Sequence, residues 1–199
     1  MTTADWTTPP TLRGQHVTLE PLSTSHADGL KAAVEDGRLY EIWYTNVPEA
    51  KDVEAYIDGA LAKQAKGEQL AFVVRESDGR IVGTTRYYEL TPEVPRLQIG
   101  YTWYAQSVQR TGLNTEAKIL LLGHAFDVLR CASVGLQTSY FNLQSRTAIA
   151  RLGAKEEGIT RNHVRHRDGT LRDTVNFSII DAEWPGVKQN VLGRMGRYA

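Results

Sequence analysis

The stretch from residue 97 to residue 129 constrains the fold of this chain more than any other. Leu97–Tyr104 alternates in side-chain character as a strand does, and Leu97, Ile99, Tyr101 and Trp103 are expected on one face. A short loop follows. The next segment, Asn114–Leu129, has apolar residues on a helical stripe and on most of its remaining surface. A helix this apolar is expected to be largely buried.

The remaining pattern predicts one domain of the α/β (α+β) class spanning residues 1–199, because a chain of this length can form one core but not two ordinary ones. Hairpins in the middle of the chain, with helices interspersed, favour a mixed, mainly antiparallel central sheet of six to seven strands with helices on both faces. Residues 1–12 are expected to form a loose arm, and residues 181–199 a final helix and tail. The expected elements are strands at His16–Leu22, Leu70–Glu76, Ile81–Leu90, Leu97–Tyr104, Val134–Thr138, Ala154–Arg165 and Leu171–Ile180, and helices at Ala27–Glu35, Lys51–Lys66, Asn114–Leu129, Ser145–Leu152 and after the cap Asp181.

Composition argues against several classes of partner. Lys plus Arg and Asp plus Glu both number 23, and no basic run stands out, so neither nucleic acid nor a membrane surface is expected to bind. The single cysteine, Cys131, excludes an internal disulfide and a thiol-rich metal site, and no metal is expected. With no apolar leader and no apolar run of roughly 18 residues, a cytoplasmic location is expected.

The loop between the strand and the apolar helix has the features of an anion site. The first turn of a helix carries N–H groups without internal partners and the positive end of the helix dipole. Gly112 would let these groups approach a phosphate, and Arg110 and Lys118 would add positive charge. The alternative is an ordinary strand–loop–helix corner in which Gly112 serves only the turn.

This loop resembles the signature loop of the GNAT acetyltransferases, Gln/Arg-x-x-Gly-x-Gly/Ala. Here it reads Gln109-Arg-Thr-Gly-Leu-Asn114, and the continuation Asn-Thr-Glu-Ala resembles the RimJ/RimL-like branch, which acetylates ribosomal-protein N-termini. Asn114 departs from the usual small residue. The resemblance implies acetyl-CoA as cofactor, with its pyrophosphate on the loop. The cofactor-binding residues it implies there are Gln109, Arg110, Thr111, Gly112, Leu113, Asn114 and Thr115, with backbone groups of Tyr101, Thr102 and Trp103 on the preceding strand.

A second segment supports the same resemblance. Asn142-Leu-Gln-Ser145, followed by Leu152-Gly-Ala154, is similar to the family's Asn-x-x-Ser…Leu-Gly-Phe pattern. In the family the asparagine bonds the pantetheine arm of CoA, and the serine protonates the departing thiolate. By themselves, Asn142 is a good helix N-cap and Ser145 a plain first-turn residue.

The general base is where the sequence departs from the family. Many relatives carry a glutamate on the third central strand, where this chain has Gln98. Others use a carboxylate on a later strand, at a position that aligns with Val164, beside His163 and His166. His163 is the preferred candidate because imidazole titrates near neutral pH, with Tyr88 and Glu89 as alternatives. The preferred account is that no strong base is needed, since an α-amino group or an aromatic amine is already partly neutral.

Aromatic residues are expected to line the acceptor pocket, between the second central strand, the first two helices and the connection that joins those helices. Such a pocket suits an apolar or ring-bearing amine better than a basic peptide tail. Each of these side chains could equally be an ordinary core or rim aromatic. The candidates are Trp43, Tyr44, Tyr87, Tyr88 and Tyr140.

Three functions follow from this sequence. The first is direct transfer of an acetyl group from acetyl-CoA to the primary amine of a small molecule or amino acid, in a ternary complex. The second is acetylation of protein N-termini, and the third is a non-catalytic acyl-CoA-binding module, which Gln98 keeps open. Neither the acceptor nor the oligomeric state can be read from the sequence, although a homodimer is an option.

Overall fold

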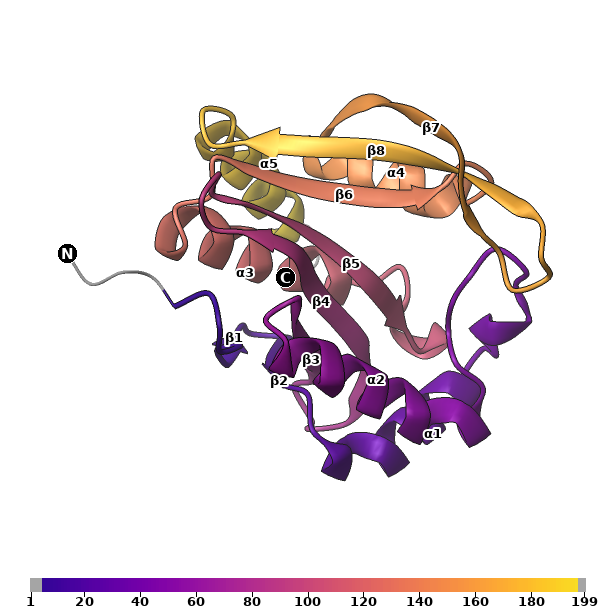
Figure 1. The fold of residues 1–199 in the computed structure, drawn as a ribbon. Helices are drawn as coiled ribbons and strands as arrows, with labels where there is room; N and C mark the ends of the chain where they lie inside the picture. Colours follow the sequence, from indigo (N-terminus) through magenta and orange to yellow (C-terminus); the bar gives the residue numbers. More distant parts are fainter. Residues whose placement is uncertain (1–4, 197–199) are drawn as a thin grey trace.

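The computed structural model describes residues 5–196, which form one central sheet with helices on both faces (Figure 1). The eight strands lie in the order β1-β2-β3-β4-β5-β6-β8-β7. All neighbouring pairs are antiparallel except β5 and β6, which are parallel. The strands are β1 Leu12–Arg13, β2 Val17–Pro21, β3 Gln69–Glu76, β4 Ile81–Thr91, β5 Arg96–Tyr104, β6 Ser133–Ser139, β7 Lys155–Arg165 and β8 Leu171–Ile180.

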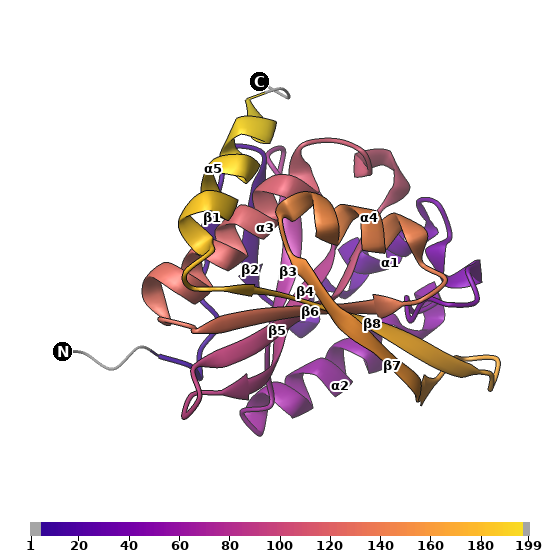
Figure 2. The ribbon, with the colours of Figure 1, turned by 90° about the horizontal axis from the view of Figure 1, so that it is seen from above.

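The helices divide between the two faces of the sheet (Figure 2). On one face lie α1 and α2, and on the other lie α3, α4 and α5. Their bounds are α1 Ala27–Glu35, α2 Val53–Ala65, α3 Leu113–Gly123, α4 Leu143–Leu152 and α5 Trp184–Met195. Among residues 5–196, no helix combines the length and the apolar character that crossing a bilayer requires.

The fold class and the order of the predicted strands and helices are confirmed, with differences at the edges. The sheet gains an eighth strand, the two-residue β1, which is too short to produce an alternating pattern. Residues 5–12 are not a loose arm, because Trp6 and Leu12 pack against the core. Residues 1–4 and 197–199 of the predicted arm and tail lie outside the described part of the chain.

Two predicted helices have different ends. The apolar helix is α-helical only to Gly123 and continues as a π-helical turn over His124–Val128. The final helix begins at Trp184 rather than after a cap at Asp181, because Pro185 suits the first helical turn and lacks the N–H that an interior position would need.

A carboxylate on the buried face of α3 connects this helix to the start of β2. Glu116, only 4% exposed, accepts backbone hydrogen bonds from Gln15 (2.7 Å), His16 (2.7 Å) and Val17 (2.8 Å). The carboxylate therefore ties the start of β2 to a helix about a hundred residues later. This contact explains the burial of a charged side chain better than the helix dipole alone.

Candidate active site

In the loop from Gln109 to Thr115, most backbone N–H groups have no hydrogen-bond acceptor among the described residues. Its side chains fix its shape: Gln109 Nε2 donates to the Tyr104 carbonyl (3.0 Å), and Thr111 Oγ1 donates to the Val108 carbonyl (2.7 Å) while accepting the Leu113 N–H (3.2 Å). Within the described residues, no acceptor is bonded to the N–H groups of Arg110, Thr111, Gly112, Asn114 and Thr115. Free donors at the positive end of a helix fit a phosphate group.

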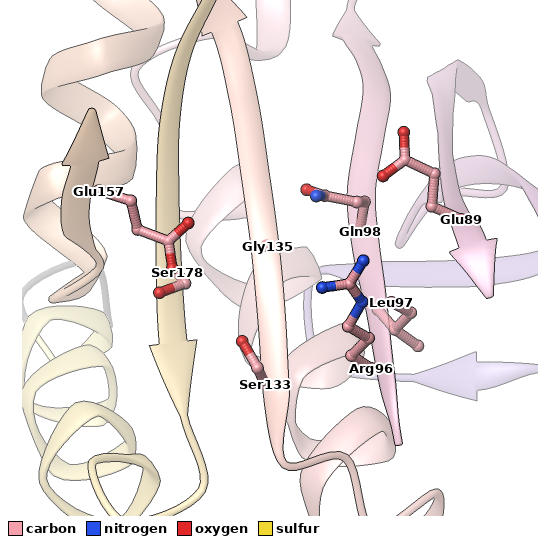
Figure 3. A pocket seen from close by; sticks show the side chains of 8 residues that line it. All are labelled: Glu89, Arg96, Leu97, Gln98, Ser133, Gly135, Glu157 and Ser178. Atoms are coloured by element: carbon pink, nitrogen blue, oxygen red, sulfur yellow. The ribbon is translucent and has the colours of Figure 1, made fainter. Parts of the chain in front are cut away.

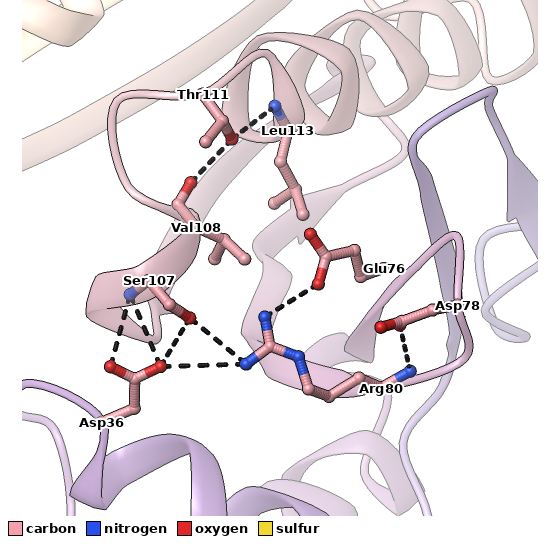
Figure 4. A network of polar contacts seen from close by, with 8 residues as sticks. All are labelled: Asp36, Glu76, Asp78, Arg80, Ser107, Val108, Thr111 and Leu113. Carbon is pink, nitrogen blue, oxygen red and sulfur yellow. Dashed lines mark hydrogen bonds and ion pairs between the residues drawn. The ribbon is translucent and has the colours of Figure 1, made fainter.

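A polar network supports this loop from below (Figure 4). Asp36, just after α1, accepts from the Ser107 hydroxyl at 2.5 Å, and its backbone carbonyl accepts the Gln106 N–H at 2.9 Å. Arg80 joins Ser107 Oγ at 3.2 Å to Glu76 Oε2 at 2.8 Å. The start of the loop is thus fixed to α1 and to the β3–β4 turn.

One expectation about charge at the loop is wrong. Lys118 does not lie at the edge of the anion site, because it is 7% exposed and its Nζ donates to Thr102 Oγ1 inside the protein at 2.9 Å. Burial lowers the pKa of Lys118 to about 7. The left-handed residue of the loop is Arg110, with φ of 63°, whereas Gly112 has an ordinary φ of −68° as N-cap of α3.

Strands β5 and β6 part at the level of Ile99. They pair in parallel from Arg96↔Ser133 to Ile99↔Leu136, and no pair follows. At this point β5 has a bulge: Gly100 pairs with Arg86 and Trp103 with Thr84, so two residues oppose one, and Tyr101 has a φ of 51°. The backbone groups of β5 beyond Ile99 are therefore not bonded to β6.

The bulge overturns the predicted alternation of β5. Thr102 turns toward α3, where its hydroxyl lies 2.8 Å from Thr85 Oγ1 and binds Lys118. Tyr101 turns to the opposite face, against Arg86 and Tyr88. Leu97 and Ile99 therefore do not share a face with Tyr101, because the extra residue shifts the period of two by one.

Gln98 lines a polar pocket on the face that carries α1 and α2 (Figure 3). Its side chain lies over Gly135, where a Cβ would collide with it. Its Oε1 is buried without a donor among the described residues. Glu89 lines the same pocket and is exposed on β4, so this carboxylate lies nearer to the family's glutamate position than the sequence suggested.

Asn142 and Ser145 meet at the N-terminus of α4. Asn142 is the N-cap, and its Oδ1 accepts the Ser145 N–H at 3.0 Å. The capping role is therefore present, and it leaves the Asn142 amide nitrogen free for another acceptor. Both residues are partly exposed.

The two histidines of the β7–β8 hairpin have different environments. His163 is exposed on β7, with Nδ1 3.1 Å from Thr174 Oγ1. His166 is 5% exposed, and its ring lies 4.8 Å from that of Trp43 with Nε2 unpartnered. Burial first, and then the nearby Arg172 charge, lower the pKa of His166.

Most of the predicted acceptor aromatics gather near the opening between β5 and β6, but one does not. Trp43 contacts Tyr44 and Phe141, Phe141 contacts Tyr140, and Tyr88 contacts Tyr101. Tyr87 instead lies in the core, fully buried on the α3 face, with its hydroxyl donating to the Leu121 carbonyl at 2.6 Å. It cannot line the pocket, because strand alternation sends Tyr87 and Tyr88 to opposite faces.

Sequence reasoning missed two arginines in this region, Arg86 on β4 and Arg172 on β8. The signal for Arg86 was a charged residue in the middle of a strand that is otherwise largely buried. Arg172 gave no comparable signal, because its neighbours Leu171 and Asp173 share one face of the strand but are apolar and charged, so no buried face can be read there.

Comparison with known proteins agrees with this geometry. Residues 16–155 match the acetyltransferase (GNAT) domain family. The chain is 31% identical over 111 residues to YdaF of Bacillus subtilis, described as a ribosomal N-acetyltransferase; the match covers 56% of this chain and 60% of that protein.

Solved structures show the same fold over nearly the whole chain. An acetyltransferase of T. thermophilus is 30% identical, with a TM-score of 0.82 and coverage of 94% of this chain and 97% of that one. RimJ of Mycobacterium smegmatis, solved with a CoA disulfide, is 24% identical with a TM-score of 0.77 and coverage of 93% of both chains, a likeness of fold alone. The family match over residues 16–155 and the T. thermophilus structure at 30% identity together show that this protein belongs to the GNAT acetyltransferase family and is an acyltransferase.

Proposed function

We propose that this protein transfers the acetyl group of acetyl-CoA to an α-amino group, with both substrates bound at once. The observation that carries the proposal is the set of free N–H groups in the loop before α3, which follows the strand that parts from β6. This arrangement offers a phosphate site and an opening through the sheet for a thioester. Acetyl-CoA supplies the activated acyl group.

The residues proposed to hold acetyl-CoA lie on the α3 and α4 side. The loop N–H groups from Arg110 to Thr115 would bind the pyrophosphate, and the amide of Asn142 would bind the pantetheine arm. Backbone N–H groups between Tyr101 and Trp103, freed by the parting of the strands, would polarise the thioester carbonyl. The Ser145 hydroxyl is the proposed proton donor to the thiolate.

An α-amino acceptor is consistent with an amide, rather than a carboxylate base, at position 98. With a pKa of about 8, an α-amino group is neutral in a sizeable fraction at pH 7.5, whereas a lysine side chain with a pKa of about 10.4 is neutral in roughly one molecule in a thousand. Holding the neutral amine close to the thioester carbonyl can then supply much of the rate without a general base. His163, which is exposed, and Glu89, in the Gln98 pocket, remain the alternatives.

The α-amino group belongs either to an amino acid or to a peptide N-terminus. The name of the Bacillus subtilis relative favours the peptide, while the aromatic surface around Trp43 favours a smaller molecule. A cytoplasmic location remains a prediction from the sequence.

The first experiment is calorimetric titration with acetyl-CoA, followed by assays of free thiol release with amino acids, amines and peptides. Gly112→Trp should abolish binding, while Gly186→Trp, on the exposed side of α5 with open space around it, should leave binding intact. Binding without thiol release on any amine would favour the non-catalytic module. Failure of the folded wild type to bind acetyl-CoA would overturn the proposal.

The need for a base is tested separately. His163→Ala, Glu89→Gln and Gln98→Ala are each expected to change kcat by less than about tenfold. A loss of about 100-fold or more that depends on pH, in any one of them, would identify a base and refute the account by positioning.

A further inference from the structure

Arg86 is a buried cation without a carboxylate partner. The side chain is 4% exposed, and its guanidinium carbon lies 4.5 Å from the ring centroids of both Tyr56 and Tyr101. Its single polar contact among residues 5–196 is a long one, from Nη1 to Gln69 Oε1 at 3.4 Å, and its Nε has no partner. A buried charge of this kind is costly unless a counter-charge joins it, and contact with two rings offsets only part of that cost.

Arg172 approaches the same place from β8. It is partly buried, and its Nε is enclosed without a partner. Across the described chain, no ion pair joins either arginine to a carboxylate. Burial lowers the pKa of Arg172, which means that the cost of removing its charge from water is not fully offset by neighbouring groups.

Arg86 and Arg172 both lie beside the Tyr88–Tyr101 pair. Arg86 lies over the Tyr101 ring, and Arg172 lies close to Tyr88, whose ring centroid is 5.2 Å from that of Tyr101. The bulge of β5 turns Tyr101 to this face, where the residue is 42% exposed. The Tyr101 side of the place is therefore open to solvent, and it lies beside the parting of β5 and β6.

The surroundings leave this place positively charged. Near Arg172, His166 packs edge-on against Trp43, and burial together with the Arg172 charge lowers the pKa of His166, which disfavours a charged ring there. Two carboxylates lie nearby. Glu89 is next to Tyr88 in the sequence, and Asp168 is close enough to His166 for its charge to favour the protonated ring, while it accepts a hydrogen bond from Thr170. Neither forms an ion pair with Arg86 or Arg172.

We propose that Arg86 and Arg172 bind a carboxylate of the acceptor, so that the acceptor carries an anionic group close to the amine that is acetylated. The proposal rests on the function proposed above and specifies its substrate class. Guanidinium groups match carboxylates in shape and charge. The carboxylate comes either from a free amino acid or from an acidic side chain at the start of a peptide.

The test compares acceptors that carry or lack one carboxylate, and in the phenylalanine pair the ratio is read against the arginine variants because amidation also lowers the pKa of the α-amino group. One pair is phenylalanine and phenylalaninamide; the other is a C-terminally amidated peptide beginning Ser-Asp and the same peptide beginning Ser-Asn. Thiol release gives kcat/KM, and calorimetry on the CoA-bound protein gives affinity whether or not acetyl transfer occurs. The pair that shows a preference identifies the source of the carboxylate.

Wild type is expected to prefer the anionic member of at least one pair by about tenfold or more. Arg172→Gln and Arg86→Gln should remove that preference, and Arg172→Lys should restore part of it. Arg151→Gln, a matched change at an exposed position on α4, should retain it. If Arg86→Gln does not fold, the Arg172 variants decide.

The outcomes separate the two proposals. Acetylation without preference for the anionic member overturns this inference and leaves the acetyltransferase function standing. Equal losses with both members in the arginine variants show a purely structural role and also overturn it. Failure of the wild type to bind acetyl-CoA overturns the proposed function itself. If the wild type binds the anionic acceptor more tightly and the arginine variants do not, the inference is supported even where turnover is slow.

Discussion

Replacing Glu116 by glutamine is expected to destabilise the protein strongly, although the change is nearly isosteric. Oε1 accepts the Gln15 N–H, and Oε2 accepts the N–H groups of His16 and Val17, all within 2.8 Å. Glutamine keeps one acceptor oxygen and presents an NH₂ group at the other site. At least one of these N–H groups then loses its acceptor, and the remaining bonds lose their charge assistance.

The magnitude follows from these contacts. A hydrogen bond to a charged group contributes about 1.5–3 kcal/mol, a neutral one about 1 kcal/mol, and an unpaired buried N–H costs a further 1–3 kcal/mol or so. The expected loss in the free energy of unfolding is therefore about 2–4 kcal/mol. For a chain of this size each kcal/mol lowers Tm by roughly 2–4 °C, so a decrease of roughly 5–15 °C is expected.

The assay is thermal unfolding followed by circular dichroism, with urea unfolding to obtain the free energy. Glu93→Gln is the matched control, because Glu93 is exposed in the β4–β5 loop without a hydrogen bond or ion pair in the described structure. A decrease in Tm no larger than that of Glu93→Gln would show that Glu116 does not hold β2 against α3. The account of its burial would then be wrong.

Three further predictions follow from individual contacts. Gly14→Ala should lower Tm by several degrees, because the added Cβ would collide with the Glu116 carboxylate; an unchanged Tm would contradict this. Lys118→Met should raise Tm at pH 7, and its advantage over the wild type should shrink toward pH 10. The pKa of Lys118 is about 7 in the folded protein against 10.5 in the unfolded chain, so between these values the unfolded state holds the extra proton and wild-type stability rises with pH. Thermal melts of both proteins from pH 7 to pH 10 test this, and a constant difference in Tm would contradict it. Asp36→Asn should weaken acetyl-CoA binding several-fold in calorimetry, because the Ser107 support of the loop loses its charge, whereas unchanged affinity would show that the loop holds its shape alone.

Features that depend on local sequence were predicted well. The apolar helix, the hairpins and the strand–loop–helix corner follow from periodicity and turn residues, which act over a few positions. Helix α1 has the predicted bounds, and Asn142 caps α4 as its side chain suggested. The bulge at Tyr101 could not be predicted, because Tyr101 is not a residue that favours positive φ, and the bulge reversed the expected faces of β5 beyond it.

The sequence by itself determined the family, the fold class and the position of the loop proposed to bind acetyl-CoA, because each is carried by residues close together in the chain. Only the tertiary structure decided which side chains surround the proposed acceptor site. Arg86, Tyr101 and Arg172 come from three different strands, and their meeting depends on strand order and on one extra residue in β5. The bond from Glu116 to the start of β2 likewise spans about a hundred residues. Such contacts leave no periodic signal in the chain, since the free energy that specifies them comes from burial and charge compensation, which exist only after the fold has formed.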